Sequence, residues 1–291
     1  MQAGERFGNH DSASHRLSAT ISPLLAWLDA AMEFVLYLTL GALAGVLAGL
    51  FGVGGGLVIV PVLVFSFTAQ GVAPEVLTHL AVGTSLATIV FTSINSVLAH
   101  HQKGAVRWPL VGWMTLGILA GTGLGSLTAA ALQGPVLQKI IGVFAILMAV
   151  QMGLDLRPKA AGSVPGKPGL TVAGAVIGWA SAIFGIGGGS LTVPFLSWRS
   201  VPMPQAVATS AACGVPIAVA GAASFMVVGW HEAALPEWSL GFVYLPAMVG
   251  IALTSMFFAR LGARLAHRLS PKVLRRLFAL LLLTVGTNFL I

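Results

Sequence analysis

The sequence has few charged residues and a single cysteine. Only 8% of its 291 residues are Asp, Glu, Lys or Arg, and Cys213 has no second cysteine with which to form a disulfide within the chain. All eight carboxylates lie in the amino-terminal tail, in loops or at the ends of apolar segments. Cation pumps and proton relays usually need an acid inside the membrane, so this placement argues against a cation as substrate.

Motifs for nucleotide, metal and nucleic-acid binding are also missing. The glycine-rich stretches match neither Gly-x-Gly-x-x-Gly nor the phosphate loop with its lysine, and His231-Glu232 lacks a second histidine four residues on. The net charge of +7 comes from basic residues in short loops between apolar runs, where they act as topology signals. We therefore expect no cofactor, no metal, no nucleic-acid partner and no catalytic residues.

Hydrophobic residues make up 57% of the chain, well above the roughly 45 to 50% of soluble domains. This composition predicts an all-α polytopic membrane protein that contacts lipid. Residues 1–32 form a polar tail, and 157–169 form a linker between two halves, 33–156 and 170–291. The predicted apolar segments are 33–51, 57–69, 77–99, 108–132 and 136–155, followed by 170–184, 190–198, 204–229, 239–262 and 272–291.

A glycine-rich motif occurs once in each half. Phe-Gly-Val-Gly-Gly-Gly at 51–56 precedes Pro61, and Phe-Gly-Ile-Gly-Gly-Gly at 184–189 precedes Pro194. Each motif interrupts an apolar run and is followed by a segment shorter than the roughly 20 residues that a membrane crossing needs. We expect two repeats, each with a broken or re-entrant helix; whether its first two segments form a hairpin or two short crossings stays open.

Loop charges indicate how the two repeats are oriented. The loop with Lys103 and Arg107 corresponds to one with Glu232 and Glu237 in the second half. Two further basic stretches are the linker, with Arg157 and Lys159, and the loop from Arg260 to Arg276. If three segments of each half cross, an odd number, the repeats are inverted, and all three basic loops fall on one side. By the positive-inside rule that side is cytoplasmic, which makes the linker cytoplasmic and both termini periplasmic.

The glycine runs are the strongest candidates for a binding site. A helix that starts after such a run exposes unpaired N–H groups at its positive end, which favours an anion. The candidates are Gly54, Gly55, Gly56, Gly187, Gly188 and Gly189. The alternative is close helix packing, which better explains the glycines spaced by four, Gly41, Gly45 and Gly49, and Gly117, Gly121 and Gly125.

Hydroxyl, amide and imidazole groups extend the candidate site. Thr84-Ser85 and Thr209-Ser210 occupy matching positions in the two halves, Ser93 and Asn95 continue a polar stripe, and Ser190 follows the second glycine run. These groups can donate to an anion's oxygens, or they can bond within and between helices, and Ser190 can cap its helix. His79 and His100 are candidates for proton coupling, or interfacial anchors.

Together these motifs resemble the sulfite exporter TauE/SafE family. The resemblance covers 33–291 and includes the two glycine motifs, Ala-Val-Gly-Thr-Ser at 81–85, Ala-Val-Ala-Thr-Ser at 206–210, and His-His-Gln-Lys-Gly at 100–104. It implies a bacterial inner-membrane secondary transporter that exports small sulfur-containing anions such as sulfite, sulfonates or sulfoacetate. Alternating access around a shared anion site is the expected mechanism. An anion channel and, less favoured, an intramembrane enzyme are the alternatives; the sequence leaves the oligomeric state open.

Overall fold

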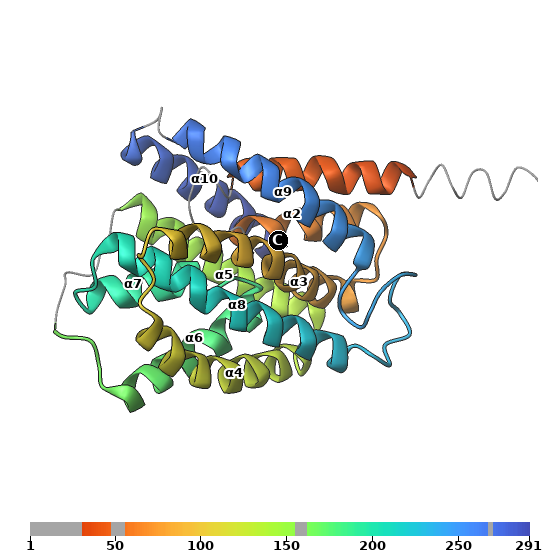
Figure 1. Ribbon diagram of the computed structural model, residues 1–291. Helices are drawn as coiled ribbons and strands as arrows, with labels where there is room; N and C mark the ends of the chain where they lie inside the picture. Colours follow the sequence, from red (N-terminus) through yellow and green to blue (C-terminus); the bar gives the residue numbers. More distant parts are fainter. Residues whose placement is uncertain (1–30, 48–55, 155–161, 267–269) are drawn as a thin grey trace, which may run out of the picture.

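The computed structural model describes residues 31–47, 56–154, 162–266 and 270–291, which are helical and contain no β-strand (Figure 1). A helix at Ala31–Leu47 comes first. It is followed by α2 (Gly56–Ala69), α3 (Pro74–Gln102), α4 (Trp108–Ala130), α5 (Gly134–Gly153), α6 (Lys167–Phe184), α7 (Gly189–Trp198), α8 (Met203–Val228), α9 (Leu245–Ala266) and α10 (Pro271–Leu290). Most of these helices have a proline in the first turn, where its missing N–H is harmless.

The predicted all-α polytopic class is confirmed. Within the described ranges, six helices are long and apolar enough to cross a membrane. They are α3, α4, α5, α6, α8 and the Leu245–Gly262 part of α9. By contrast, α2 and α7 have 14 and 10 residues and each contains a proline, Pro61 or Pro194.

Each short helix returns the chain towards the side from which its partner helix started. In the first half, the Tyr37 hydroxyl lies 2.9 Å from the side-chain oxygen of Gln70, which follows α2. In the second half, Ser200 after α7 donates to the Gly162 carbonyl before α6 at 3.1 Å. Because the two ends of each pair meet, Ala31–Leu47 runs antiparallel to α2, and α6 to α7, so each pair forms a helical hairpin.

Helices α3 and α8 pack antiparallel at the centre of the bundle, as Figure 1 shows. A methyl group added at Gly83 would lie 3.0 Å from Cβ of Phe225, and one added at Gly214 would lie 3.1 Å from Oγ of Ser93. Rising residue numbers on α3 therefore meet falling numbers on α8. Thr84, Ser85, Thr209 and Ser210 are buried along this pair.

Glycines at matching positions hold the hairpin helices against the opposite half. On the first hairpin helix, Gly41 packs on the backbone of Ile251 and Gly45 on that of Ser255, both in α9. On α6, Gly174 packs on Met114 and Gly178 on Ile118, both in α4. The opposing glycines Gly117, Gly121 and Gly125 of α4 face Thr171, Ala175 and Trp179. The close-packing interpretation of the glycines spaced by four is therefore confirmed where they are described; Gly49 lies outside the described residues.

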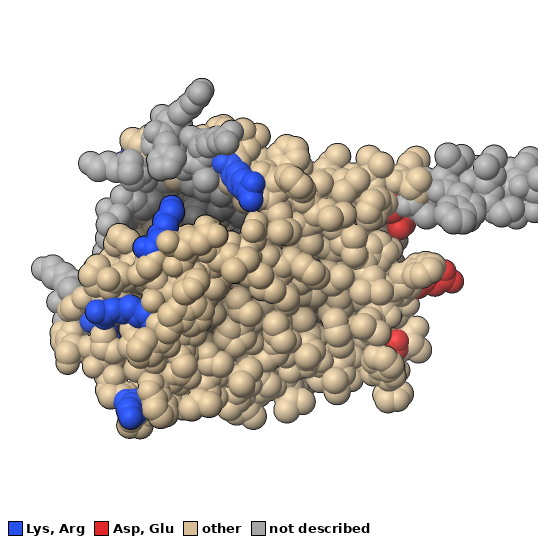
Figure 2. Space-filling view, in the orientation of Figure 1, with Lys and Arg blue, Asp and Glu red and all other residues tan. Residues whose placement is uncertain are grey.

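Most charged residues that the structure describes are separated along the long axis of the bundle; Lys139, at the start of α5 beside the Glu75 end, is an exception. In the view of Figure 2, Lys and Arg side chains lie at one end and Asp and Glu side chains at the other, with an uncharged surface between them. Trp113 and Trp198 carry Lys167 and Arg199 over their rings, at 5.0 and 4.1 Å. This banded surface suits a protein whose middle faces lipid.

Candidate functional site at the broken helices

The break between α6 and α7 is built from backbone conformations that favour glycine. Gly185, directly after α6, has a φ of 65°, and Gly188, directly before α7, has a φ of 73°. The amides of Gly185 and Ile186 both donate to the carbonyl of Ser181, which closes the end of α6. After the turn, α7 starts a new helix, and its first N–H groups have no acceptor within the helix.

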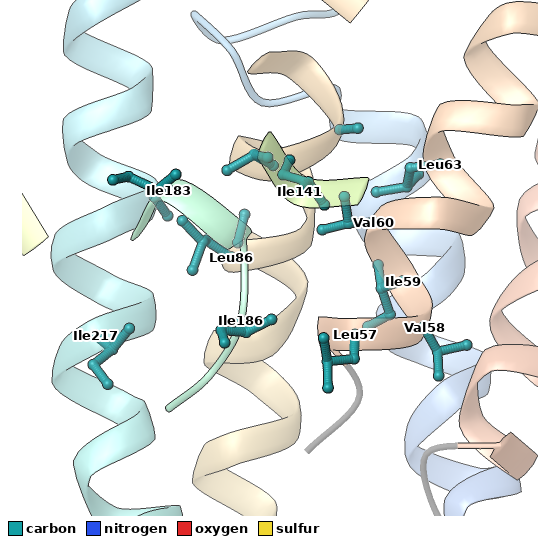
Figure 3. Packing of buried hydrophobic residues seen from close by; sticks show 14 of the residues in the cluster. Leu57, Val58, Ile59, Val60, Leu63, Leu86, Ile141, Ile183, Ile186 and Ile217 are labelled. Carbon is teal, nitrogen blue, oxygen red and sulfur yellow. The ribbon is translucent and has the colours of Figure 1, made fainter. Parts of the chain in front are cut away.

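The start of α2 lies against this turn. A methyl group added at Gly56 would lie 2.7 Å from Cα of Ile186 and 2.8 Å from the Gly185 carbonyl oxygen, so only glycine allows the approach. In Figure 3, Ile186 stands between Leu57 of α2 and Ile217 of α8. The two glycine motifs, far apart in sequence, thus meet through Gly56 and Gly185 in the interior of the bundle.

Helices α3 and α8 complete the surroundings of the turn. Ser85 of α3 donates its hydroxyl hydrogen to the Gly185 carbonyl at 2.9 Å, and both groups are buried. A methyl group at Gly214 of α8 would lie 2.8 Å from the Gly187 carbonyl oxygen and 3.1 Å from Oγ of Ser93. Gly187 and Gly189 are only half-buried. The turn is therefore supported by both central helices.

Several hydroxyl groups near this turn are buried without a hydrogen-bond partner among the described residues. They are Oγ of Ser181, Oγ of Ser190, Oγ1 of Thr192 and Oγ of Ser210. Ser190 is 6% exposed, Ser210 2% and Thr192 0%. A buried hydroxyl with no partner costs stability, so such groups in a native fold call for an explanation.

The threonines of the matching Thr-Ser pairs bond to loops of the opposite half. The Tyr244 amide, just before α9, donates to Oγ1 of Thr84 at 2.9 Å. The Arg107 amide, just before α4, donates to Oγ1 of Thr209 at 3.1 Å. Each threonine thus anchors the start of a helix in the other repeat, and the interhelical interpretation of these hydroxyls has direct geometric support.

The remaining candidates lie along α3 or outside the described residues. His79 is buried, lies 2.9 Å through Nε2 from the Ala129 carbonyl and stacks on Phe242. Asn95 and His100 are half-buried in the second half of α3. Their proposed roles in anion binding and proton coupling stay predictions. Gly54 and Gly55 fall outside the described residues.

Thr192 is a candidate that the motif search missed. It is one hydroxyl in the apolar stretch after the glycine run, and a threonine there is common in membrane helices. The signal that finds it is the alignment of the two motifs, in which Thr192 corresponds to Ile59 and Ser190 to Leu57. Only the second repeat carries hydroxyls at these positions.

Comparison with known proteins identifies the family. A profile described as sulfite exporter TauE/SafE matches residues 37–289, nearly the whole described chain. The chain belongs to the sulfite exporter TauE/SafE family. Within this family it is 40% identical over 255 residues to a "probable membrane transporter protein" of Haemophilus influenzae, a match that covers 87% of this chain and 97% of the relative.

More distant TauE/SafE relatives have similar names. A probable membrane transporter protein of Methanocaldococcus jannaschii is 28% identical over 267 residues, and the match covers 89% of this chain and 97% of the relative. The protein YunE of Bacillus subtilis, also named a probable membrane transporter, is 28% identical over 280 residues, and the match covers 89% of this chain and 98% of YunE. These names describe membrane transporters rather than enzymes. No solved structure matches the chain.

Proposed function

We propose that this TauE/SafE protein is a secondary transporter that exports small sulfur-containing anions, such as sulfite, sulfonates or sulfoacetate, by alternating access. The observation that carries the proposal is the meeting of the two glycine motifs, where Gly56 at the start of α2 lies against Gly185 and Ile186. Substrates of inverted-repeat transporters bind where broken helices meet near the bilayer centre. Rocking of the repeats around that point would expose the site to each side in turn.

The chemistry of the site favours an anion. The start of α7 supplies free N–H groups and the positive end of a helix dipole, and hydroxyls at Ser190 and Ser210 add donors. No carboxylate in the sequence lies in the middle of an apolar segment to repel an anion there, and no lysine or arginine lies there to hold it permanently. Binding by dipoles and hydroxyls is compatible with release on the far side.

Counterflow in proteoliposomes tests the mechanism. Vesicles loaded with unlabelled sulfite are diluted into radiolabelled sulfite, and a transporter transiently accumulates label against its gradient. A channel lets label equilibrate without overshoot, which would replace the transporter proposal by the channel alternative. Repeating the assay with methanesulfonate, sulfoacetate and sulfate inside the vesicles orders the substrates by the size of the overshoot.

We further propose that the two halves are inverted repeats in the bacterial inner membrane, with the linker cytoplasmic and both termini periplasmic. Three contacts of one half recur at equivalent positions in the other and support this arrangement. The contact of Thr84 with Tyr244 matches that of Thr209 with Arg107, and the contacts of Gly41 and Gly45 with α9 match those of Gly174 and Gly178 with α4. The segregation of basic and acidic residues to opposite ends in Figure 2 supports it as well.

Cysteine labelling tests the orientation. Ala233 and Gln102 are exposed in loops or helix ends at opposite ends of the bundle, whereas the native Cys213 is buried. Ala233→Cys should react with an impermeant maleimide added to spheroplasts, and Gln102→Cys should react only after permeabilisation. Reaction of both from one side would contradict the inverted arrangement.

A further inference from the structure

The buried side of α7 is polar. Its buried residues are Ser190, Thr192 and Leu196, and neither hydroxyl of the first two has a partner among the residues that the structure describes. A helix that packs only for stability buries apolar side chains, or hydroxyls that bond back to its own carbonyls. The polar side of α7 does neither, so packing alone does not account for it.

Both hydroxyls belong to the first turn of the helix. Gly188 is the residue that precedes α7, and its carbonyl accepts from the Thr192 amide at 2.7 Å. Oγ1 of Thr192 lies 3.4 Å from the point that a Cβ on Gly188 would occupy, so the hydroxyl faces back towards the helix start. Ser190 is the second residue of the helix. Free N–H groups, the positive dipole end and two hydroxyl donors therefore gather in a single turn.

The first turn of α2, at the equivalent positions of the first repeat, carries no hydroxyl group. After Gly56, α2 continues with Leu57, Val58, Ile59 and Val60, all buried. Leu57 takes the place of Ser190, and Ile59 takes the place of Thr192. In Figure 3, Leu57 and Val60 lie on the side of α2 that faces Ile186 and Leu86, whereas Val58 points away from them.

We propose that the anion site is one-sided: Ser190 and Thr192, with the first N–H groups of α7, bind the oxyanion, and α2 supplies an apolar wall without hydroxyl donors. The inference rests on the proposed anion-transport function and adds Thr192 as a specificity-determining residue. The recognised chemistry is an ionised oxyanion with several acceptor oxygens. Sulfite, sulfate and the head of a sulfonate share it, and the assay separates them.

The test compares two quantities whose changes have opposite signs. Thr192→Val removes a hydroxyl that has no partner among the described residues and keeps the shape of the side chain, so the melting temperature of the anion-free protein should stay the same or rise. The affinity for sulfite, measured by isothermal titration calorimetry in detergent, should fall by about tenfold or more. Ser190→Ala should act in the same way, and Thr192→Ser should restore binding.

Thr88→Val is the matched control. Thr88 is also fully buried, but its hydroxyl donates to the Thr84 carbonyl at 2.9 Å. This change should lower or leave the melting temperature and leave sulfite affinity unchanged. Leu57→Ala, at the first-repeat position equivalent to Ser190, should change affinity by less than about threefold, because it removes no donor.

The outcomes separate the two proposals. Titrations with sulfite, sulfate and methanesulfonate on the unaltered protein decide whether it binds oxyanions at all, and binding of none of them would overturn the proposed function together with this inference. If the unaltered protein binds an oxyanion, equal affinity in Thr192→Val and Ser190→Ala would overturn the one-sided site alone. A loss of affinity on Leu57→Ala as large as that on Ser190→Ala would also overturn it, since both repeats would then contribute equally.

Discussion

The short helices α2 and α7 begin alike and differ in what they bury. Each follows a glycine run and has a proline five residues after its last glycine, Pro61 or Pro194. However, α2 buries an almost entirely apolar surface over 14 residues, whereas the 10-residue α7 buries two hydroxyls and one leucine. The repeats have kept the same backbone design while their side-chain chemistry has diverged.

This difference separates two requirements of the site. The glycines decide whether the broken helices can approach, and that requirement applies to both halves. In the proposed one-sided site, the hydroxyls of Ser190 and Thr192 select the anion, and the equivalent positions of the first half carry none. Substitutions at the glycines should therefore act symmetrically, and substitutions of polar side chains should not.

The largest effect is expected at the glycines of the two breaks. Gly56→Val places a side chain against the backbone of Ile186, and Gly188→Val forces a β-branched residue into a left-handed conformation, with Cδ1 of Ile217 only 2.5 Å from the new Cβ. Both variants should lose transport of radiolabelled sulfite in proteoliposomes. Normal transport by either variant, in folded protein, would show that the two breaks do not share one site.

The next largest effect, a loss of stability, is expected where the hairpin helix α6 packs on α4. A methyl group at Gly121 would clash with the backbone of Ala175, whereas one at Gly123 would meet no atom within 4 Å. Gly121→Ala should destabilise the protein by about 1 to 3 kcal/mol, and Gly123→Ala should have almost no effect. Melting temperatures in detergent measure the difference.

Gly45→Ala extends the same test to the other half. An added methyl group there would lie 2.7 Å from the backbone of Ser255 in α9. Destabilisation similar to that of Gly121→Ala would strengthen the view that both hairpins are held by equivalent contacts. A stable Gly45→Ala variant would break the comparison at the level of the fold.

The apolar runs and the glycine-rich breaks in the sequence predicted the helix bounds well, because both signals depend only on neighbouring residues. The predicted segments 57–69 and 190–198 differ from α2 and α7 by a single residue at the start. The segment predicted from 239 instead begins its helix at Leu245. Residues before it are apolar but form a loop in which Gly241 has a φ of 55° and the Phe242 amide donates to the Phe225 carbonyl. Composition alone does not separate such a buried loop from a helix.

The sequence predicted where candidate site residues lie, but it did not predict which groups their side chains contact. The symmetry of Thr84-Ser85 and Thr209-Ser210 was visible in the sequence, but their partners are backbone groups that the fold brings from far away. For Ser85 the partner is the Gly185 carbonyl, and for Thr84 it is the Tyr244 amide. No local pattern encodes such contacts. Thr192 becomes a candidate only once the fold shows that its hydroxyl is buried and has no partner in the described part of the chain.

The paired threonines should show intermediate effects on stability. Thr84→Val leaves the buried Tyr244 amide without its acceptor and should cost about 1 to 3 kcal/mol. Thr209→Val removes a part-buried contact to the Arg107 amide and should cost less. Thermal unfolding measures both, and sulfite titration checks function. A tenfold loss of affinity with unchanged stability would instead make these hydroxyls direct anion donors.

The smallest effects are expected at the open ends of the two hairpins, where a side-chain hydrogen bond joins the two helices of each pair. Tyr37→Phe removes the part-buried contact with Gln70 and should cost about 0.5 to 1.5 kcal/mol. Ser200→Ala removes an exposed bond to the Gly162 carbonyl, where water can replace the lost donor, so its effect on the melting temperature should be close to zero. Because neither residue lies near Gly185 or Ser190, sulfite affinity should stay unchanged in both variants. A clear fall in affinity on Tyr37→Phe alone would mean that the first hairpin positions the site through its outer end, and that the halves differ in mechanics as well as in the chemistry of α2 and α7.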